Sequence, residues 1–482
     1  MIGTAKLFRI IGKSLVALAG IIGVPLVYAL VVDDPFLPFV YAAAVTGFTG
    51  GLLLILTRGS KSDLAQRKGI LSVTAIWFLI SVFGCLPFRF SQHSAGFTAA
   101  FFEAASGFTT TGATVLADVE SIPRSLQLWR CFSNWIGGMG AILLGIAILP
   151  LVSIGGIQLY RADFPGARSE KLGHRIRETV QALWGIYLAL TIVAFLSLRL
   201  SGMGVFDAVC HSFSIVSTGG FSTRNDGIAA FRNPAIECIV IVLMLIAGMN
   251  FTLHYRLWIK RQFRRFFSDP ETRAYLLVVL STTVLVSLSL ILRDRFALTD
   301  ALRHSTFQVC SIMTGTGLST DNFGNWNSFS QLVLLMLMFF GACTGSTSGG
   351  LKTARILLLV KVVGREFRRI VEQRGVFIIR LGSRSIPEQT IQSLLNLMYI
   401  AFLTNLTSCL LLSLAGMDVF TSISAVTACM FNVGPGLGQV GPAFQYGALP
   451  AFAKWILSIC MLVGRLEYYA VLVICTRAFW RR

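Results

Sequence analysis

Long apolar runs alternate with short polar segments along almost the whole chain of 482 residues. A membrane-spanning helix needs about 20 consecutive, mostly apolar residues. On that criterion the pattern predicts ten spanning helices, near residues 9–32, 38–57, 70–88, 128–152, 178–200, 232–257, 274–293, 328–360, 389–415 and 449–476. The first run follows basic residues as a signal peptide does, but it is long and no clear cleavage site follows, so we expect a retained helix.

The last eight predicted helices form four consecutive pairs. Between the two helices of each pair lies a shorter apolar segment. These segments are 101–114, 206–222, 299–319 and 418–437. In each, a short apolar helix pattern ends in three small residues, which we call a glycine motif. The four glycine motifs are Thr110-Thr111-Gly112, Thr218-Gly219-Gly220, Gly315-Thr316-Gly317 and Asn432-Val433-Gly434.

The glycine motifs recur about every hundred residues, which is the sequence signature of an internal repeat. Each copy opens with an acid that we expect at the positive end of its short helix: Glu103, Asp207, Asp300 and Asp418. A small residue also stands six positions before the last glycine: Ser106, Ser214, Ser311 and Ala428. Four copies of one unit predict four similar walls around one axis.

The predicted fold is therefore an all-α polytopic membrane protein with four pseudo-fourfold helix–pore-loop–helix repeats and two additional N-terminal transmembrane helices. The two N-terminal helices occupy residues 1–69, and the pore repeats occupy 70–157, 158–258, 259–384 and 385–482. The third repeat includes an interrupted second helix.

Basic residues are concentrated between the repeats, in 58–68, 158–177, 256–273 and 352–384. Lys and Arg are enriched in cytoplasmic loops of membrane proteins, so these segments and both termini are expected in the cytoplasm, with the glycine motifs facing outside. The same distribution explains the net charge of +19 without nucleic-acid binding.

The composition agrees with a membrane protein and offers no chemistry for catalysis. Hydrophobic residues make up 55% of the chain and charged residues 13%, whereas soluble domains carry about 25% charged residues. The ten cysteines form no CxxC pair and no zinc-like cluster with histidine. No nucleophile–base or paired-carboxylate arrangement stands out, so an enzyme is disfavoured.

The glycine motifs suggest an ion filter. Their segments are too short to span, and irregular backbone at membrane depth persists only where it is buried in protein or lines a water-filled path. Glycine lets carbonyl groups adopt directions that a Cβ forbids, and a ring of carbonyl oxygens can replace the hydration shell of a monovalent cation. The alternative is that small residues only let helices pack closely, but four motifs in register favour the filter.

These repeats resemble the Trk/Ktr/HKT superfamily of potassium transporters, and the two N-terminal helices with TTTGAT, STGGFS, MTGTGLST and NVGPGLG resemble its bacterial TrkH/TrkG-type membrane subunits. The resemblance implies a K+ filter at Gly112, Gly220, Gly317 and Gly434 with the residues just before them. The intact Gly112 implies potassium rather than sodium. Gly219 and Gly220 remain alternatives in the second motif, and Asn432 and Pro435 depart from the other copies.

The apolar run of the third repeat is interrupted at residues 341–353, GACTGSTSGGLKT. A phosphate-binding loop is disfavoured, because Leu351 separates Gly350 from Lys352. The resemblance implies instead an intramembrane loop that obstructs the path beneath the filter. We expect this gate to comprise Gly345, Ser346, Thr347, Ser348, Gly349, Gly350 and Lys352.

Arg465 is a charge within the last apolar run, where an ionisable residue is costly and marks a functional candidate. A local pair with Glu467 is the ordinary explanation. The resemblance implies a pore-facing arginine near the gate loop, where its charge would repel K+.

The predicted function is channel-like uptake of K+ across the bacterial inner membrane. The alternative is a symporter that couples K+ to H+ or Na+, but most acids lie at segment ends rather than at mid-membrane. The resemblance implies a homodimer in the lipid bilayer and a cytosolic TrkA-type regulatory subunit that binds nucleotides, while no nucleotide site is expected in this chain. K+ is the only ion implied.

Overall fold

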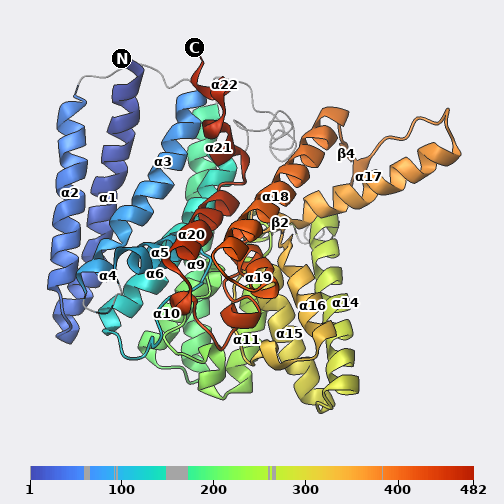
Figure 1. Ribbon diagram of the computed structural model, residues 1–482, viewed down its shortest axis with the longest axis horizontal. Coiled ribbons are helices and arrows are strands. Elements are labelled where there is room, and N and C mark those ends of the chain that lie inside the picture. Colours follow the sequence, from blue (N-terminus) through green and yellow to red (C-terminus); the bar gives the residue numbers. More distant parts are fainter. Residues whose placement is uncertain are drawn as a thin grey trace.

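The computed structural model describes residues 2–58, 66–91, 93, 96–147, 172–258, 261–262, 268–382 and 384–481. These residues are predominantly helical (Figure 1). The first half contains α1 (Ile2–Val32), α2 (Leu37–Leu56), α3 (Gln66–Gly84), α4 (Leu86–Phe90), α5 (Phe97–Phe108), α6 (Arg124–Ala147), α9 (Leu172–Leu200), α10 (Val205–Val216), α11 (Pro234–Ala247) and α12 (Phe251–Trp258).

The second half contains α14 (Pro270–Arg293), α15 (Leu298–Thr314), α16 (Ser328–Met338), α17 (Thr353–Val371), α18 (Glu388–Leu414), α19 (Val419–Met430), α20 (Ala451–Arg465), α21 (Tyr469–Leu472) and α22 (Arg477–Trp480). Two-residue strands flank two loops: β1 (Phe340–Gly341) pairs with β2 (Leu351–Lys352), and β3 (Arg380–Leu381) pairs with β4 (Arg384–Ser385). The prediction of an all-α polytopic membrane protein is confirmed.

Six helices of the described residues are long and apolar enough to cross a bilayer. They correspond to the predicted spans near 9–32, 38–57, 70–88, 178–200, 274–293 and 389–415. The prediction of a continuous helix is wrong for the runs 232–257 and 449–476, whereas the interruption within 328–360 is found as expected. The chain bends by 98° between α11 and α12 and by 110° between α20 and α21, and residues 339–352 separate α16 from α17.

The α11–α12 break leaves backbone groups that a distant segment of the chain binds. At the α11–α12 break, the Gly248 carbonyl accepts a hydrogen bond from the Cys343 amide at 2.9 Å, and the Phe251 amide donates to the Gly345 carbonyl at 3.1 Å. Glu467, with φ +56°, lies in the turn between α20 and α21. A broken helix is tolerated at membrane depth when protein groups bind the freed amides and carbonyls, so the loop after α16 and the break after α11 stabilise each other.

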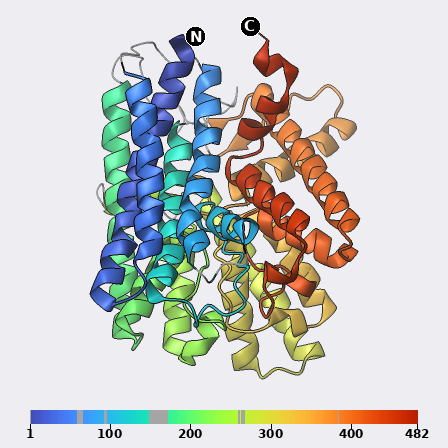
Figure 2. The ribbon, with the colours of Figure 1, turned by 60° about the vertical axis from the view of Figure 1, so that its left-hand side comes forward.

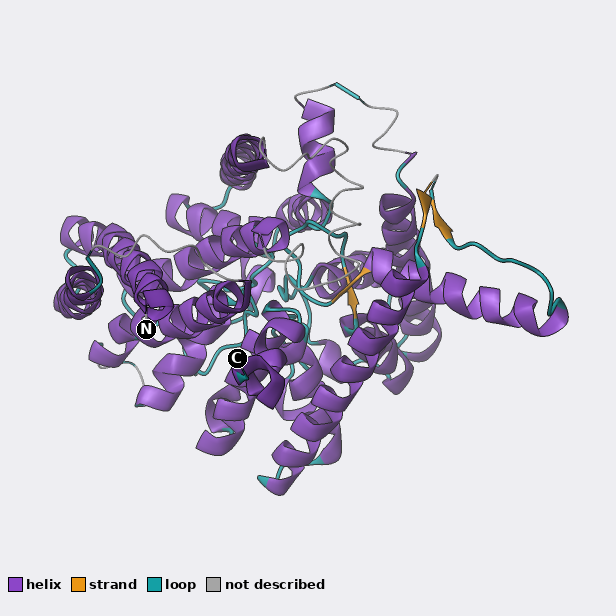
Figure 3. Ribbon diagram, turned by 90° about the horizontal axis from the view of Figure 1, so that it is seen from above, coloured by secondary structure: helices purple, strands orange, loops and turns teal. Residues whose placement is uncertain are grey.

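The short helices α5, α10, α15 and α19 lie towards the centre, and the long helices surround them (Figures 1 and 2). Of the twelve residues of α5, ten are buried. Helices α1 and α2 pack side by side at one edge of the molecule in both views. Seen from above, loops gather in the middle of the helices (Figure 3).

Both termini lie at one end of the molecule, and α17 with the β3–β4 hairpin projects sideways near the same end (Figure 1). This arrangement agrees with a common side for the termini and the basic segment 352–384. Segment 158–177 lies mostly, and segments 58–68 and 256–273 partly, outside the described residues. The repeat boundaries stay predictions, and those at 157/158 and 258/259 also fall outside them.

Candidate functional site

Three of the four short helices begin with an acid as predicted. Asp207 and Asp300 lie in the first turns of α10 and α15, and the side chain of Asp418 caps α19 by accepting a hydrogen bond from the Thr421 amide at 2.9 Å. The prediction is wrong for the first repeat, because Glu103 lies in the middle of α5 rather than in its first turn. Glu103 is buried and paired with Arg130, so its role differs from that of the other acids.

All four short helices end in the same backbone motif. The residue that opens each glycine motif is in the left-handed region, with φ of +54° at Thr110, +53° at Thr218, +68° at Gly315 and +55° at Asn432. The next residue donates its amide to a carbonyl five positions earlier, at 2.8–2.9 Å. This is the hydrogen bond of a Schellman C-cap, and its acceptors are the small residues that the repeat pattern singled out: Ser106, Ser214, Ser311 and Ala428.

The last glycines of the four motifs also have positive φ, and they interlock. A Cβ added at any one of them would strike a carbonyl oxygen of the following wall. Gly112 meets Gly219, Gly220 meets Thr316, Gly317 meets Val433, and Gly434 meets Thr111. The fourth wall thus returns to the first, so the four motifs form one closed ring, which we call the glycine ring.

The same geometry distinguishes Gly219 from Gly220. Gly220 has φ +77° and faces the third wall, as Gly112 with φ +80° faces the second. Gly219 corresponds to Thr111, and a Cβ there would point to Asn134 of α6. Gly220 is therefore the structural equivalent of Gly112.

The fourth motif joins the ring despite its different sequence. Asn432 takes the left-handed conformation, which asparagine tolerates better than most residues. Its side-chain amide donates to the Thr111 hydroxyl at 2.9 Å and to the Met461 carbonyl at 3.1 Å. Asn432 therefore supplies a link between the fourth and first walls.

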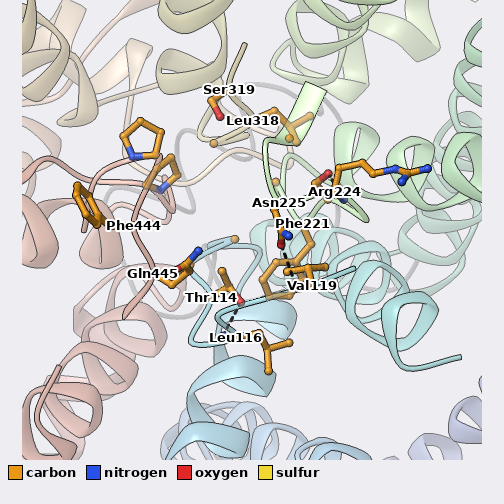
Figure 4. Close-up of a pocket in the computed structure, with 18 of the residues that line it drawn as sticks. Thr114, Leu116, Val119, Phe221, Arg224, Asn225, Leu318, Ser319, Phe444 and Gln445 are labelled. Atoms are coloured by element: carbon orange, nitrogen blue, oxygen red, sulfur yellow. Dashed lines mark hydrogen bonds between the residues drawn. The ribbon is translucent and has the colours of Figure 1, made fainter. Parts of the chain in front are cut away.

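A funnel that is open to solvent lies on one side of the glycine ring. Its lining comes from all four repeats (Figure 4): the labelled residues are Thr114, Leu116, Val119, Phe221, Arg224, Asn225, Leu318, Ser319, Phe444 and Gln445. Next to the lining residue Val119, hydrogen bonds from the Asn225 side chain and the Glu120 amide lower the pKa of Asp118 from its usual value.

The loop between β1 and β2 lies against the other side of the glycine ring. The Thr218 hydroxyl donates to the Thr347 hydroxyl at 3.3 Å. A Cβ at Gly315 would lie 3.7 Å from the Ser348 hydroxyl, and one at Gly349 would lie 2.8 Å from the Asn432 Cβ. The predicted gate residues thus come together with three walls of the ring, and the three residues Thr347, Ser348 and Gly349 make the contact.

Arg465 ends α20 and binds this loop. Its guanidinium donates to the Thr347 carbonyl at 2.9 Å and to the Gly137 carbonyl of α6 at 3.5 Å. Glu467 pairs with Arg355 of α17 at 2.5 Å instead. The local pair between Arg465 and Glu467 is therefore not the arrangement found.

Two contacts of the loop have no counterpart in the sequence pattern. Lys352 donates its ammonium group to the Ser348 carbonyl within the loop. Glu271 of α14 holds both ends of the loop: its carboxylate accepts the Thr344 amide at 2.6 Å, the Thr344 hydroxyl at 2.9 Å and the Ala354 amide at 3.1 Å. An acid in the first turn of an apolar helix was the only signal for Glu271.

Within the described ranges, no group of three or more His, Cys, Asp and Glu could hold a metal ion. The oxygens that the structure places against the ring glycines are the carbonyl oxygens of Gly219, Thr316, Val433 and Thr111. Such neutral oxygens suit a monovalent cation that gives up its water.

Comparison with known proteins identifies the family. The model of the TrkH family of cation transport proteins matches residues 38–481. The chain belongs to the TrkH family. The potassium uptake protein TrkH of Salmonella typhimurium is 39% identical over 478 residues, covering 98% of each chain. The potassium uptake protein TrkG of Escherichia coli K12 is 35% identical over 460 residues, covering 95% of this chain and 94% of its own.

The fold is likewise that of the TrkH family. The crystal structure of the potassium transporter TrkH from Vibrio parahaemolyticus superposes with a TM-score of 0.92 at 36% identity, covering 99% of this chain and all of that one. The resemblance inferred from the glycine motifs is therefore confirmed. Since TrkH relatives are transport proteins, the prediction that the chain is not an enzyme is confirmed too.

Proposed function

We propose that the chain takes up K+ across the bacterial inner membrane and conducts it through the glycine ring. The observation that carries this proposal is that the four glycine motifs form a closed ring. A funnel lies on one side of this ring, and the loop between β1 and β2 lies on the other. The names of the Salmonella and Escherichia relatives support potassium as the ion.

The ring supplies oxygens where a dehydrated cation needs them. The C-terminal ends of α5, α10, α15 and α19 all meet the ring, and helix C-termini carry partial negative charge. We assign the K+ filter to Thr110, Thr111, Gly112, Thr218, Gly219, Gly220, Gly315, Thr316, Gly317, Asn432, Val433 and Gly434.

The loop beneath the ring acts as the gate in this proposal. Its residues Gly345, Ser346, Thr347, Ser348, Gly349 and Gly350 fill the exit, and Arg465 and Lys352 add positive charge there. K+ passes when the loop withdraws from Thr218 and Asn432. Withdrawal requires the Arg465–Thr347 bond to break.

Conduction resembles that of a channel because three acids near the path already have partners. Glu103 pairs with Arg130, Glu467 pairs with Arg355, and Glu271 binds loop amides. Coupled transporters use intramembrane carboxylates that gain and lose protons or bind the coupling ion. The alternative, a K+ symporter coupled to H+ or Na+, needs one of these acids to be released during transport.

Cation flux in proteoliposomes tests the proposal. With K+ and Na+ gradients imposed separately, we expect K+ flux and a reversal potential set by K+ alone. A reversal potential that follows pH or Na+ would establish symport instead, and the absence of K+ flux would refute the proposed function.

The assembly and orientation are part of the same proposal. We expect both termini in the cytoplasm, a homodimer, and a cytosolic TrkA-type nucleotide-binding subunit on the basic cytoplasmic face. The projecting helix α17 carries basic residues on this face, including Arg365, Arg368 and Arg369. Purification with the cytosolic subunit, followed by mass measurement, tests both contacts.

Replacing Glu271 with alanine is expected to raise K+ flux about tenfold. The substitution leaves the partly buried amides of Thr344 and Ala354, at the two ends of the loop, without their acceptor. A lost acceptor costs ~1–3 kcal/mol, and 1.4 kcal/mol corresponds to a tenfold shift. Initial rates of K+ uptake into proteoliposomes give the measurement.

Asp269→Asn is the matched control for Glu271→Ala. Asp269 caps the same helix through the Thr272 amide at 2.9 Å, and asparagine caps equally well. We expect wild-type flux from Asp269→Asn. Equal flux in wild type and Glu271→Ala would contradict the proposal that Glu271 stabilises the closed loop by binding both of its ends.

A further inference from the structure

A buried ion pair stands behind the glycine ring, at the side where the first and second walls meet. Arg130 of α6 binds Glu103 of α5 through its Nε atom at 2.7 Å, and both side chains are at most 2% exposed. Burying two charges is costly unless each has full hydrogen-bonding partners. The other contacts of this pair are therefore informative.

On the first wall, the pair holds the chain just beyond Gly112. The Glu103 carboxylate accepts the Thr114 hydroxyl at 3.0 Å and the Val115 amide at 3.0 Å. The Arg130 guanidinium also donates to the Thr114 hydroxyl, at 3.2 Å. The Thr114 hydroxyl thus donates a hydrogen bond to Glu103 and accepts one from Arg130.

On the second wall, Arg130 reaches the matching position. Its Nη1 atom donates to the Ser222 carbonyl at 3.1 Å, and its guanidinium lies 4.3 Å from the centre of the Phe221 ring. Ser222 follows Gly220 by two residues, as Thr114 follows Gly112. One guanidinium therefore fixes equivalent positions in two neighbouring walls.

The third and fourth walls are held by neutral groups instead. The Ser311 hydroxyl donates to the Leu318 carbonyl at 2.6 Å, and the Tyr446 hydroxyl donates to the Gly434 carbonyl at 2.8 Å. Each of these bonds supports its wall from within the same repeat. The link through Arg130 differs because it joins two walls and carries charge.

We infer that Glu103 and Arg130 are positioning residues that set the spacing of the first and second walls and thereby the preference of the glycine ring for K+ over Na+. This inference rests on the proposed function of the ring. A shift of one wall changes how closely ring oxygens approach the ion, and a smaller ion such as Na+ gains from a ring that can contract.

The pair also matters for the charge at the funnel, since Arg130 is part of its lining. The negative charge of Glu103 offsets the repulsion that the positive charge of Arg130 would exert on an approaching cation. Removing the negative charge would leave an unpaired buried guanidinium beside the path, so cation entry would slow. The two residues are therefore expected to give different phenotypes.

The test compares Arg130→Lys, Glu103→Gln and wild type in proteoliposomes, with the K+/Na+ permeability ratio taken from reversal potentials under opposed K+ and Na+ gradients. Lysine keeps the charge for Glu103 but lacks the planar fork that reaches two walls. We expect the ratio to fall about tenfold in Arg130→Lys, as befits loss of a charged hydrogen bond. We expect Glu103→Gln to lower total cation flux about tenfold on the same basis.

Glu237→Gln is the matched control. Glu237 of α11 is buried and pairs with Arg303 of α15 at 3.4 Å, between two repeats but away from the Arg130 contacts. We expect its permeability ratio to equal that of wild type. A second measurement serves variants that fold but conduct poorly. A ligand that binds the folded state raises Tm, so an ion that binds the ring more tightly raises Tm more. We expect the difference between the Tm in KCl and the Tm in NaCl to be smaller in Arg130→Lys than in wild type.

An unchanged permeability ratio in Arg130→Lys would overturn the inference while wild-type K+ flux leaves the proposed function intact. An equal change in Glu237→Gln would also overturn it, since any ion pair between two repeats would then suffice. If Arg130→Lys does not fold, an unchanged Tm difference between KCl and NaCl in Glu103→Gln overturns it, and a reduced one supports it. Absence of K+ flux in wild type would instead refute the function of the ring.

Discussion

Gly112→Ser is expected to lower K+ flux at least about tenfold and to abolish the preference for K+ over Na+. The φ of +80° at Gly112 disfavours any side chain, by ~1–2 kcal/mol. The added Cβ would also strike the Gly219 carbonyl, so an oxygen of the second wall must move. Ion flux with K+ and Na+ imposed separately measures both effects.

Gly416→Ala is the control that separates backbone strain from the ring. Gly416 has φ +87°, close to the value at Gly112, but its Cβ would meet nothing within 4 Å. We expect this variant to lose some thermal stability and to keep wild-type selectivity. If Gly112→Ser also keeps its selectivity, the glycine ring is not the filter.

Arg465→Ala is expected to raise K+ flux by roughly 30-fold. At a separation of roughly 8 Å and an effective dielectric constant of about 20, two unit charges repel by about 2 kcal/mol, which is roughly 30-fold in rate. The substitution also removes the 2.9 Å bond that holds the Thr347 carbonyl. Uptake of K+ into proteoliposomes measures the change.

Arg465→Lys distinguishes the charge from the bond. Lysine keeps the positive charge but cannot reach the Thr347 and Gly137 carbonyls with one planar group. Flux near that of wild type would indicate an electrostatic barrier, whereas a rise like that of Arg465→Ala would indicate a tether on the loop. Wild-type flux in both variants would contradict any role of Arg465 in gating.

The repeated features of the fold could be predicted because repetition makes a weak signal strong. One cluster such as Thr110-Thr111-Gly112 is compatible with ordinary helix packing, but four in register are not. The small residues six positions before each last glycine, for example Ser106, carried a real constraint: their carbonyls accept the amide that closes the helix end. The sequence showed the position, and the structure supplies the reason.

The features that could not be predicted depend on contacts between distant segments. Glu103 aligned with the other opening acids in sequence, but its partner Arg130 lies on another helix. Glu467 had a nearby arginine at Arg465, yet it pairs with Arg355, 112 residues away in the chain. Hydrophobic periodicity shows which face of a helix is buried, but it does not show which helix packs against that face. Ion pairs between distant segments therefore cannot be predicted from one sequence.

The breaks in the second helices were missed for a similar reason. The runs 232–257 and 449–476 are apolar throughout, and hydropathy alone predicts a continuous span. Gly248 and Gly464 were the available signals, but an isolated glycine is tolerated within a helix. At the α11–α12 break, the loop after α16 binds the exposed backbone, and this contact between distant segments cannot be inferred from hydropathy.

Three of the four second helices are interrupted on the same side of the ring. The molecule therefore has two layers, the ring layer and the layer of broken helices, which differ in how their parts are joined. In the ring layer, the last glycine of each motif packs against a carbonyl oxygen of the next wall. In the layer of broken helices, separate helix pieces are joined by side-chain ion pairs and hydrogen bonds, such as Arg355 with Glu467. Under the proposed function, substitutions among the broken helices can therefore change gating without moving the four glycines that face the ion.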